Sequence, residues 1–296
     1  MDWIKFGFGN ELLEYHPTEP FIIDYSAARI SDTPIDELAA QAIHRITETY
    51  PGPYTLVCSG GVDSQAMILA WLRSGVEFNI ATGRFNGGMN DHDLENLWLL
   101  QKREGFEVQV LDLDVLSFHE NELVDWAIRY QCASPHILTH MYICSKVITG
   151  TVIASGNYVI KDGILGGSTY MTFGLDRYAR WSGQSVVPHF WMHDQELMPA
   201  FEMQRRKFNL PDNRGDYAFK CELFKLCGYD VIPQTVKYNG FEKIKEYYDG
   251  RRANYKLRVK AKNYGVSNRY YDVVFRYALW DILPRMSHSG YTVFNP

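Results

Sequence analysis

The amino-acid sequence predicts an α/β fold in which a parallel sheet carries helices on both faces, followed by a mainly helical C-terminal region. Between residues 54 and 155, short apolar runs of strand length alternate with longer runs of helical spacing. This alternation is typical of parallel strands joined by right-handed crossover helices. A glycine-rich turn follows the first of these strands, and the pattern becomes helical from about residue 200.

The composition is that of an ordinary soluble globular protein. The chain has 296 residues, of which 46% are hydrophobic and 22% charged, enough for one large domain or two smaller ones. No apolar run approaches the roughly 20 residues of a membrane span, and the N-terminus lacks a signal-peptide pattern. The five cysteines form no pairing framework. We therefore expect a cytoplasmic protein without a membrane contact, and a homodimer is one possible state.

We expect three segments, namely an N-terminal arm and helix over 1–50, a central domain over 51–200 and a basic helical region over 201–296. The charge is unevenly divided between them. Residues 1–200 hold 12 Lys and Arg against 25 Asp and Glu, a net charge of −13, whereas residues 201–296 hold 18 against 10, a net charge of +8. The basic part could meet a polyanion, but a solvated surface is the simpler interpretation.

The expected elements follow the chain in order. Apolar residues between Trp3 and Phe8 suggest a short strand or packing arm, and a helix begins after Ser31, with Thr33 as N-cap and Pro34 at its first position. After the first strand at residue 54 and its helix, we expect strands at Glu77–Thr82, Phe106–Leu111 and Thr151–Ala154, and helices at Asp91–Glu104, Asn121–Tyr130, Leu138–Ile148, Leu197–Phe208, Tyr217–Leu226, Phe241–Tyr248 and Tyr271–Leu283.

The stretch YTLVCSGGVDS, residues 54–64, is the most informative part of the chain. It predicts a buried strand, a tight glycine loop and the start of a helix. Gly60 and Gly61 allow backbone conformations and a close approach that a side chain would block. The N–H groups and positive dipole end of a helix N-terminus suit a phosphate, and Ser59 and Ser64 add hydroxyl donors. The structural alternative is a glycine turn with Asp63 as a helix-capping residue.

The SGGVDS loop resembles the signature of the PP-loop ATP pyrophosphatases of the N-type branch, which includes asparagine synthetase and 7-cyano-7-deazaguanine synthase. The resemblance covers Tyr54 to Gly163 and implies a Rossmann-like, adenine nucleotide alpha hydrolase-like fold. It also implies that ATP is split between its α and β phosphates, that AMP is joined to a substrate oxygen, and that the loop holds the pyrophosphate. The loop residues concerned are Ser59, Gly60, Gly61, Val62, Asp63 and Ser64.

Two features of the sequence narrow the possible reaction and the possible nitrogen donor. The loop is not a GxxxxGK[ST] sequence, which disfavours a P-loop NTPase that cleaves ATP at the γ phosphate. The chain opens Met1-Asp2-Trp3 without the N-terminal catalytic cysteine of a glutaminase domain, so we expect ammonia, an amine or a partner's product as nitrogen donor. Compact PP-loop proteins of this kind, without a glutaminase, are also found in phage genomes.

The loop after the second strand runs from Gly83 to Asn90. The resemblance implies that the end of this strand lies against adenine, so backbone groups of Ala81 and Thr82 could bind its edge and Phe85 could stack on it. Arg84 could reach a phosphate or the substrate. Ordinary packing is the alternative for Phe85. Helix capping is preferred to a metal site for the polar run at residues 90–93.

The loop after the fourth strand resembles the second motif of the family, with Gly156 after a small residue and the acidic Asp162 several positions later. Mg²⁺ prefers oxygen ligands, so Asp63 and Asp162 are the candidate metal ligands and also candidate catalytic residues. Lys161 could stabilise charge on the α-phosphate. Residues 158–161 depart from the lysidine-synthetase pattern, and a surface Lys161 is the alternative. Because ligands bind at the carboxyl ends of parallel strands, these loops should converge.

Two further regions carry candidate binding residues. Arg177 and Arg180 lie in an aromatic segment and could bind a substrate carboxylate or phosphate, with cation–π packing as the alternative. The basic run from Arg251 to Lys262 resembles a nucleic-acid patch. A solvated face is preferred for this run, a lid over nucleotide or substrate comes second, and nucleic acid third.

The sequence therefore predicts an ATP- and Mg²⁺-dependent adenylating enzyme of the ligase type that acts on a small molecule. A substrate oxygen attacks the α-phosphorus, pyrophosphate leaves into the SGGVDS loop, and ammonia or an amine displaces AMP. Positioning and electrostatic stabilisation account for most of such catalysis. Two alternatives remain, namely a PP-loop enzyme that modifies bases of tRNA or another nucleic acid, and a nucleotide-binding module without catalysis.

Overall fold

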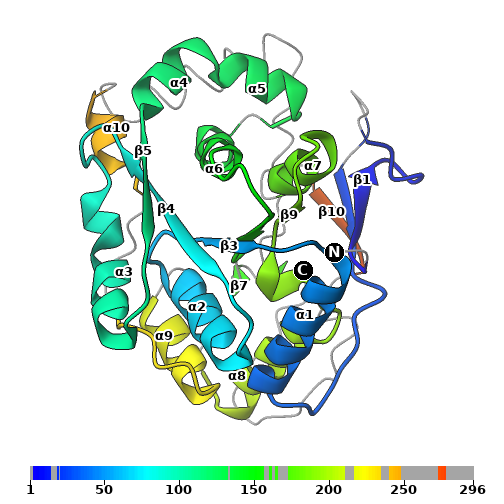
Figure 1. Ribbon diagram of the computed structural model, residues 1–296. Helices are drawn as coiled ribbons and strands as arrows, with labels where there is room; N and C mark the ends of the chain where they lie inside the picture. Colours follow the sequence, from blue (N-terminus) through cyan, green and yellow to red (C-terminus); the bar gives the residue numbers. More distant parts are fainter. Residues whose placement is uncertain are drawn as a thin grey trace.

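The computed structural model describes residues 3–14, 19, 21–132, 134–156, 160–161, 164–165, 173–210, 217–234, 240–247 and 273–277. Its centre is a five-stranded parallel sheet with the strand order β5-β4-β3-β6-β9 (Figure 1). The strands are β3 (Tyr54–Val57), β4 (Asn79–Phe85), β5 (Gln109–Leu113), β6 (Thr151–Ala154) and β9 (Val186–Val187). The chain starts in the middle at β3, moves outward to β5, and crosses back to β6. The predicted α/β fold class is confirmed.

Helices cover both faces of this sheet because its buried side chains alternate between two cores. Ile153 and Val187 point to the core shared with α1, α2, α3, α8 and α9, whereas Val152 and Val186 point to the core shared with α4 to α7. The helices of the first core are α1 (Ile35–Thr49), α2 (Val62–Ser74), α3 (Asp91–Glu104), α8 (Leu197–Lys207) and α9 (Tyr217–Leu226). Those of the second are α4 (Val115–Asn121), α5 (Leu123–Arg129), α6 (Pro135–Ser145) and α7 (Gly174–Trp181).

A second sheet joins the two ends of the chain. Strand β2 (Phe21–Asp24) pairs antiparallel with β1 (Lys5–Phe8) and parallel with β10 (Val273–Tyr277). The predicted N-terminal strand is therefore confirmed, whereas the helix predicted over 271–283 is wrong at residues 273–277. The core of the first helical layer includes residues from all three predicted segments, from Trp3 to Val231, so it continues across residues 50 and 200.

Several predicted boundaries are also corrected. Strand β4 extends to Phe85, so Arg84 and Phe85 belong to a strand and not to a loop. Lys161 lies in the short strand β7 (Ile160–Lys161), which pairs with β8 (Ile164–Leu165). The first helix has Pro34 at its N-cap, and the hydroxyl of Thr33 instead accepts a hydrogen bond of 2.7 Å from Ser31.

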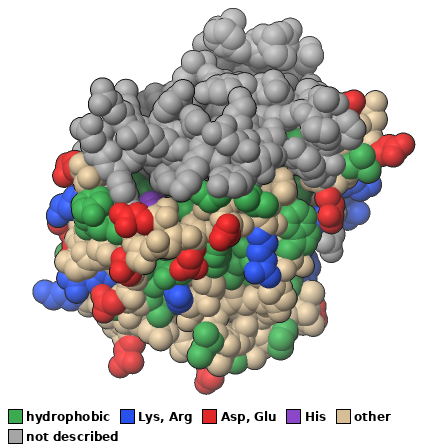
Figure 2. Space-filling model, turned by 90° about the horizontal axis from the view of Figure 1, so that it is seen from above, with side chains coloured by type: hydrophobic (Ala, Val, Ile, Leu, Met, Phe, Trp, Pro, Cys, Tyr) green, Lys and Arg blue, Asp and Glu red, His purple; other side chains and the backbone are tan. Residues whose placement is uncertain are grey.

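The remaining described elements are η1 (Phe190–Met192) and α10 (Glu242–Tyr247). None of the helices in the described part combines the length and apolarity needed to cross a membrane. On the face shown in Figure 2, acidic and basic side chains are interspersed over the described part. The basic run at 251–262 lies outside the described residues.

We expect Leu56→Ala to lower the free energy of unfolding by about 3 kcal/mol, since it leaves a cavity in a close-packed core. Leu56 lies on the central strand β3 and is 0% exposed. The matched control is Leu99→Ala, at a position that is 53% exposed, which should change the value by less than about 0.5 kcal/mol. Urea denaturation of both variants measures the difference, and equal losses would contradict the assigned core.

Candidate functional site

The SGGVDS loop makes a tight turn between the end of β3 and the start of α2. Gly60 has a φ of +84°, and a Cβ at this position would lie 2.9 Å from the carbonyl oxygen of Asp93. Only glycine fits both the backbone conformation and this close approach to α3. Gly61 is different, because its φ is −62° and a Cβ there would meet the Ser59 hydroxyl at an ordinary 3.5 Å.

The turn leaves the N-terminus of α2 suited to an anion. Gly61 is the N-cap of this 13-residue helix, and no described side chain caps its first turn. The helix dipole adds partial positive charge at the same place. Ser59 is exposed at the loop, whereas the buried Ser64 donates its hydroxyl to the Gly61 carbonyl at 2.8 Å. Ser64 therefore stabilises the turn with the hydroxyl that the sequence predicted as a donor to phosphate.

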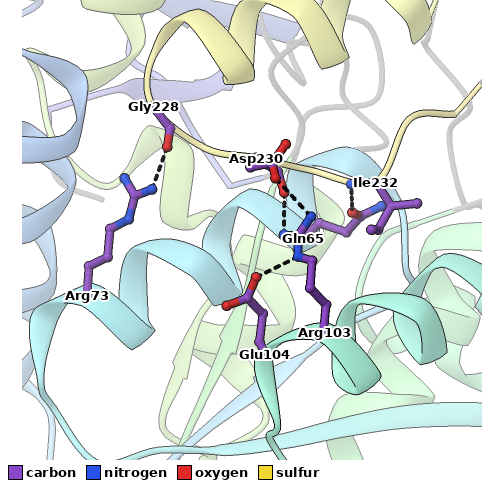
Figure 3. A network of polar contacts seen from close by, with 7 residues as sticks. All are labelled: Gln65, Arg73, Arg103, Glu104, Gly228, Asp230 and Ile232. Carbon is purple, nitrogen blue, oxygen red and sulfur yellow. Dashed lines mark hydrogen bonds and ion pairs between the residues drawn. The ribbon is translucent and has the colours of Figure 1, made fainter.

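The side chain of Gln65 holds the loop in place through hydrogen bonds. This side chain is fully buried, and its amide nitrogen donates to the Gly60 carbonyl at 2.7 Å while its amide oxygen accepts from the Ile232 N–H at 2.7 Å. The segment that carries Ile232 is in turn held on α2 and α3, where Arg73 donates to the Gly228 carbonyl and Arg103 binds Asp230 (Figure 3). The orientation of the Gly60 peptide thus depends on a segment more than 160 residues away.

Asp63 is paired with a lysine that was not among the predicted site residues. Lys220 of α9 donates to both carboxylate oxygens of Asp63, at 2.8 and 2.7 Å. The Lys220 side chain is 5% exposed and the Asp63 side chain is 15% exposed. Lys220 lies 157 positions from its partner in an ordinary amphipathic helix, so no local pattern marks it. The carboxylate is not a helix cap, which was the structural alternative for Asp63.

The loop is also attached to β4 by Ala81 and Thr82, the two residues whose backbone groups were predicted to contact adenine. The Ala81 carbonyl accepts from the Cys58 N–H at 2.9 Å, and the Thr82 hydroxyl donates to the Cys58 carbonyl at 2.7 Å. Both residues are buried. These two hydrogen bonds hold β4 against the residue that follows the C-terminal end of β3. Burial also raises the pKa of the Cys58 thiol, so it stays protonated beside the loop.

Arg84 and Phe85 are engaged in other contacts. Arg84 forms a bidentate pair with Asp91, with both distances at 2.9 Å, and this hydrogen bonding lowers the pKa of the Asp91 carboxyl. Phe85 is buried in a cluster where its ring lies edge-on to Phe241, with the ring centroids 5.8 Å apart. The packing alternative therefore describes Phe85, and Arg84 binds the first turn of α3.

The second motif begins where β6 ends. Gly156 has a φ of +71°, and a Cβ there would lie 2.9 Å from the Cβ of His189. The Ser155 carbonyl accepts from the main-chain N–H of Trp191 at 3.1 Å, and the Trp191 indole donates to the Asp63 carbonyl at 2.8 Å. The structure thus brings the loops after β3 and β6 together, as predicted. Asp162 and the side chain of Lys161 lie outside the described residues.

The described contacts of the two arginines of α7 are with other groups than the two loops. Arg177 is buried and donates to the carbonyls of Tyr130 and Gln131, at 2.9 and 3.1 Å. The Arg180 guanidinium lies 5.0 Å from the centre of the Phe6 ring. Arg180 thus shows the cation–π packing that was its structural alternative.

The sequence matches no known protein-family profile and no curated protein. Among solved structures, it is similar to NMN synthetase from Francisella tularensis, with a TM-score of 0.35 and 12% identity over 80% of this chain and 88% of that one. It is similar to the NH3-dependent NAD synthetase from Campylobacter jejuni, with a TM-score of 0.34 and 14% identity over 78% and 93% of the two chains. It is also similar to the U34-tRNA thiolase NcsA from Methanococcus maripaludis, with a TM-score of 0.30 and 12% identity over 78% of each. TM-scores below 0.5 do not establish a shared fold or function.

We expect Gly60→Ala and Gly61→Ala to differ sharply in stability. The first should lower the free energy of unfolding by about 2 kcal/mol, because a positive φ and a 2.9 Å backbone contact both penalise a Cβ. The second should stay within about 0.5 kcal/mol of the parent, because its conformation suits any residue. Thermal and urea denaturation measure the stability of both variants. A larger loss of stability in Gly61→Ala than in Gly60→Ala would contradict the described turn.

Proposed function

We propose that this protein is an ATP-dependent adenylating enzyme of the amidation type. It cleaves ATP to AMP and pyrophosphate, joins AMP to an oxygen of a small-molecule substrate, and allows ammonia or an amine to displace the AMP. The observation that carries the proposal is the SGGVDS loop, which resembles the PP-loop signature and lies at the carboxyl end of the central strand β3. Ligands of parallel sheets bind at this edge, where the strand order reverses.

The loop fits the pyrophosphate part of ATP. The first turn of α2 offers main-chain N–H groups, Ser59 offers an exposed hydroxyl, and Gly61 presents no side chain that would cover them. Lys220, which is paired with the Asp63 carboxylate, places an ammonium group at the same end of the loop. Since the leaving group is a polyanion, positive groups held in place before the reaction stabilise it most.

The residues present also fit a magnesium ion that travels with the nucleotide. No cluster of three or more metal-binding side chains gathers in the described part of the chain. Mg²⁺ does not need one, because it is commonly held by one or two carboxylates together with substrate phosphates. Asp63 would be one such carboxylate, and Asp162 is the proposed second. A bound Mg²⁺ would neutralise charge that develops on the pyrophosphate.

In the proposed reaction a substrate oxygen attacks the α-phosphorus of ATP in line with the bond to the β-phosphate. That bond breaks, and its bridging oxygen leaves with the pyrophosphate. The N–H groups of α2 and the Ser59 hydroxyl would bind this leaving group, and Lys161 is the proposed partner of the α-phosphate. Arg177 and Arg180 are engaged with other groups and have no part in this proposal. A cytoplasmic location, where ATP is abundant, is consistent with the reaction.

The deciding experiment uses ATP labelled at the α-phosphate, with Mg²⁺ and ammonium, in the presence of pooled small metabolites or of total tRNA. AMP and pyrophosphate that appear with one metabolite pool are the expected result. Release only with tRNA would favour the nucleic-acid alternative, and ADP with phosphate would contradict α–β cleavage. Tight ATP binding without cleavage in any pool would favour a binding module.

We expect Asp63→Asn to reduce pyrophosphate release at least about 100-fold, because the carboxylate that faces Lys220 and the metal is lost. The matched control is Asp125→Asn, which removes an exposed aspartate from the first turn of α5. Its rate should equal that of the parent. Initial rates from the labelled-ATP assay provide the comparison, with circular dichroism confirming that both variants are folded. Similar rates for the two variants would exclude Asp63 from the reaction.

A further inference from the structure

The turn that follows β9 lies between the two candidate loops. It consists of Pro188 and His189 followed by η1, which begins at Phe190 and contains Trp191. Because it enters the site at the carboxyl end of a sheet strand, its main chain is fixed on one side by the sheet. Nothing in its sequence pattern marks it as functional, apart from the histidine.

We propose that Trp191 is a positioning residue that sets the separation between the SGGVDS loop and the Ser155-Gly156 loop. The inference rests on the proposed function, in which the first loop binds pyrophosphate and the second adjoins the α-phosphate. Two hydrogen bonds from one residue make the connection. The indole N–H donates to the Asp63 carbonyl at 2.8 Å, and the main-chain N–H donates to the Ser155 carbonyl at 3.1 Å.

Trp191 can act as a rigid spacer because it is itself held on several sides. Its side chain is fully buried, and its ring contacts Phe201 of α8, Phe224 of α9 and Tyr229, with ring centroids 5.2, 5.5 and 5.8 Å apart. Rings locked in this way have one orientation in a close-packed core. The indole N–H therefore reaches Asp63 from a fixed point.

His189 supports the second loop from the same turn. His189 packs against Gly156. A Cβ added to Gly156 would lie 3.0 Å from the Cα of His189. Its Nε2 is 2.9 Å from a carboxylate oxygen of Asp176 on α7, and both side chains are buried. The second loop is thus braced by His189 and bound by Trp191, two residues apart on one turn.

This arrangement matters for the proposed chemistry because bond breaking between the α and β phosphates involves both loops at once. Displacement of a reacting group by about 1 Å can cost about 100-fold in rate. The Asp63 carbonyl accepts the indole hydrogen bond while the Asp63 carboxylate binds Lys220. Removing the indole donor leaves the carboxylate pair intact but releases the main chain of the first loop from the second.

The test compares Trp191→Phe with Trp71→Phe. Both tryptophans are fully buried, but the Trp71 indole N–H has no hydrogen-bond partner in the described structure, so the control removes a similar volume without a bond. We expect Trp191→Phe to raise the Kd for magnesium pyrophosphate about fivefold in calorimetric titrations, and Trp71→Phe to leave it unchanged. Equal Kd values for the parent and both variants would overturn the proposal.

Hydrogen exchange provides a readout that general destabilisation would not change. In the parent and in Trp71→Phe, pyrophosphate should slow amide exchange in peptides that cover residues 59–64 and also in those that cover 151–156. In Trp191→Phe the slowing should remain in the first loop and be lost in the second. If Trp191→Phe does not fold, the parent protein alone provides the test. Pyrophosphate that slows exchange in the parent only at residues 59–64, and not at 151–156, would overturn the proposal. A parent that binds neither pyrophosphate nor ATP would instead refute the proposed function, and this inference with it.

Discussion

The candidate site depends on one steric constraint, which is the absence of a side chain at Gly60. The chain leaves β3 and must turn against the backbone of α3 before α2 can begin. A φ of +84° and a 2.9 Å separation between an added Cβ and the Asp93 carbonyl leave room for glycine alone. The turn aims the N-terminus of α2 at the carboxyl edge of the sheet. Since β4 and β6 flank β3, this single turn places the helix end between two further strand ends.

The charges at this turn are arranged around one ion pair, in which Lys220 is buried and Asp63 is half-buried. A buried ion pair contributes little net stability, because desolvation offsets much of the attraction, whereas the loss of one partner is costly. The pair of Asp63 and Lys220 is therefore better explained by a need for both charges at the loop than by a need for stability. An anionic ligand would find a cation beside the helix dipole, and a metal would find a carboxylate.

Local patterns were sufficient to predict the central part of the fold and the loop itself. The strand, glycine turn and helix at residues 54–74 have signals within a few residues of one another, and the structure contains all three. Long-range partners leave no such signal. Lys220 and Trp191 reach Asp63 from 157 and 128 positions away, so neither could be predicted from spacing. At Val273–Tyr277 the apolar run suits a helix or a strand, and pairing with β2 decides for the strand.

Some predicted ligands are structural because other residues of the chain bind them. An arginine next to a glycine-rich stretch looks available for phosphate, but Asp91 lies seven positions later at the start of α3 and binds Arg84. Near residue 190, Trp191 packs among neighbouring rings and hydrogen-bonds to both loops. The SGGVDS motif is the proposed site of the chemistry, and its geometry is held by Gln65 with Ile232, by Lys220 and by Trp191. All but Gln65 lie beyond the stretch that carries the family resemblance, and residues 201–296 contribute Lys220 and Ile232 to the candidate site.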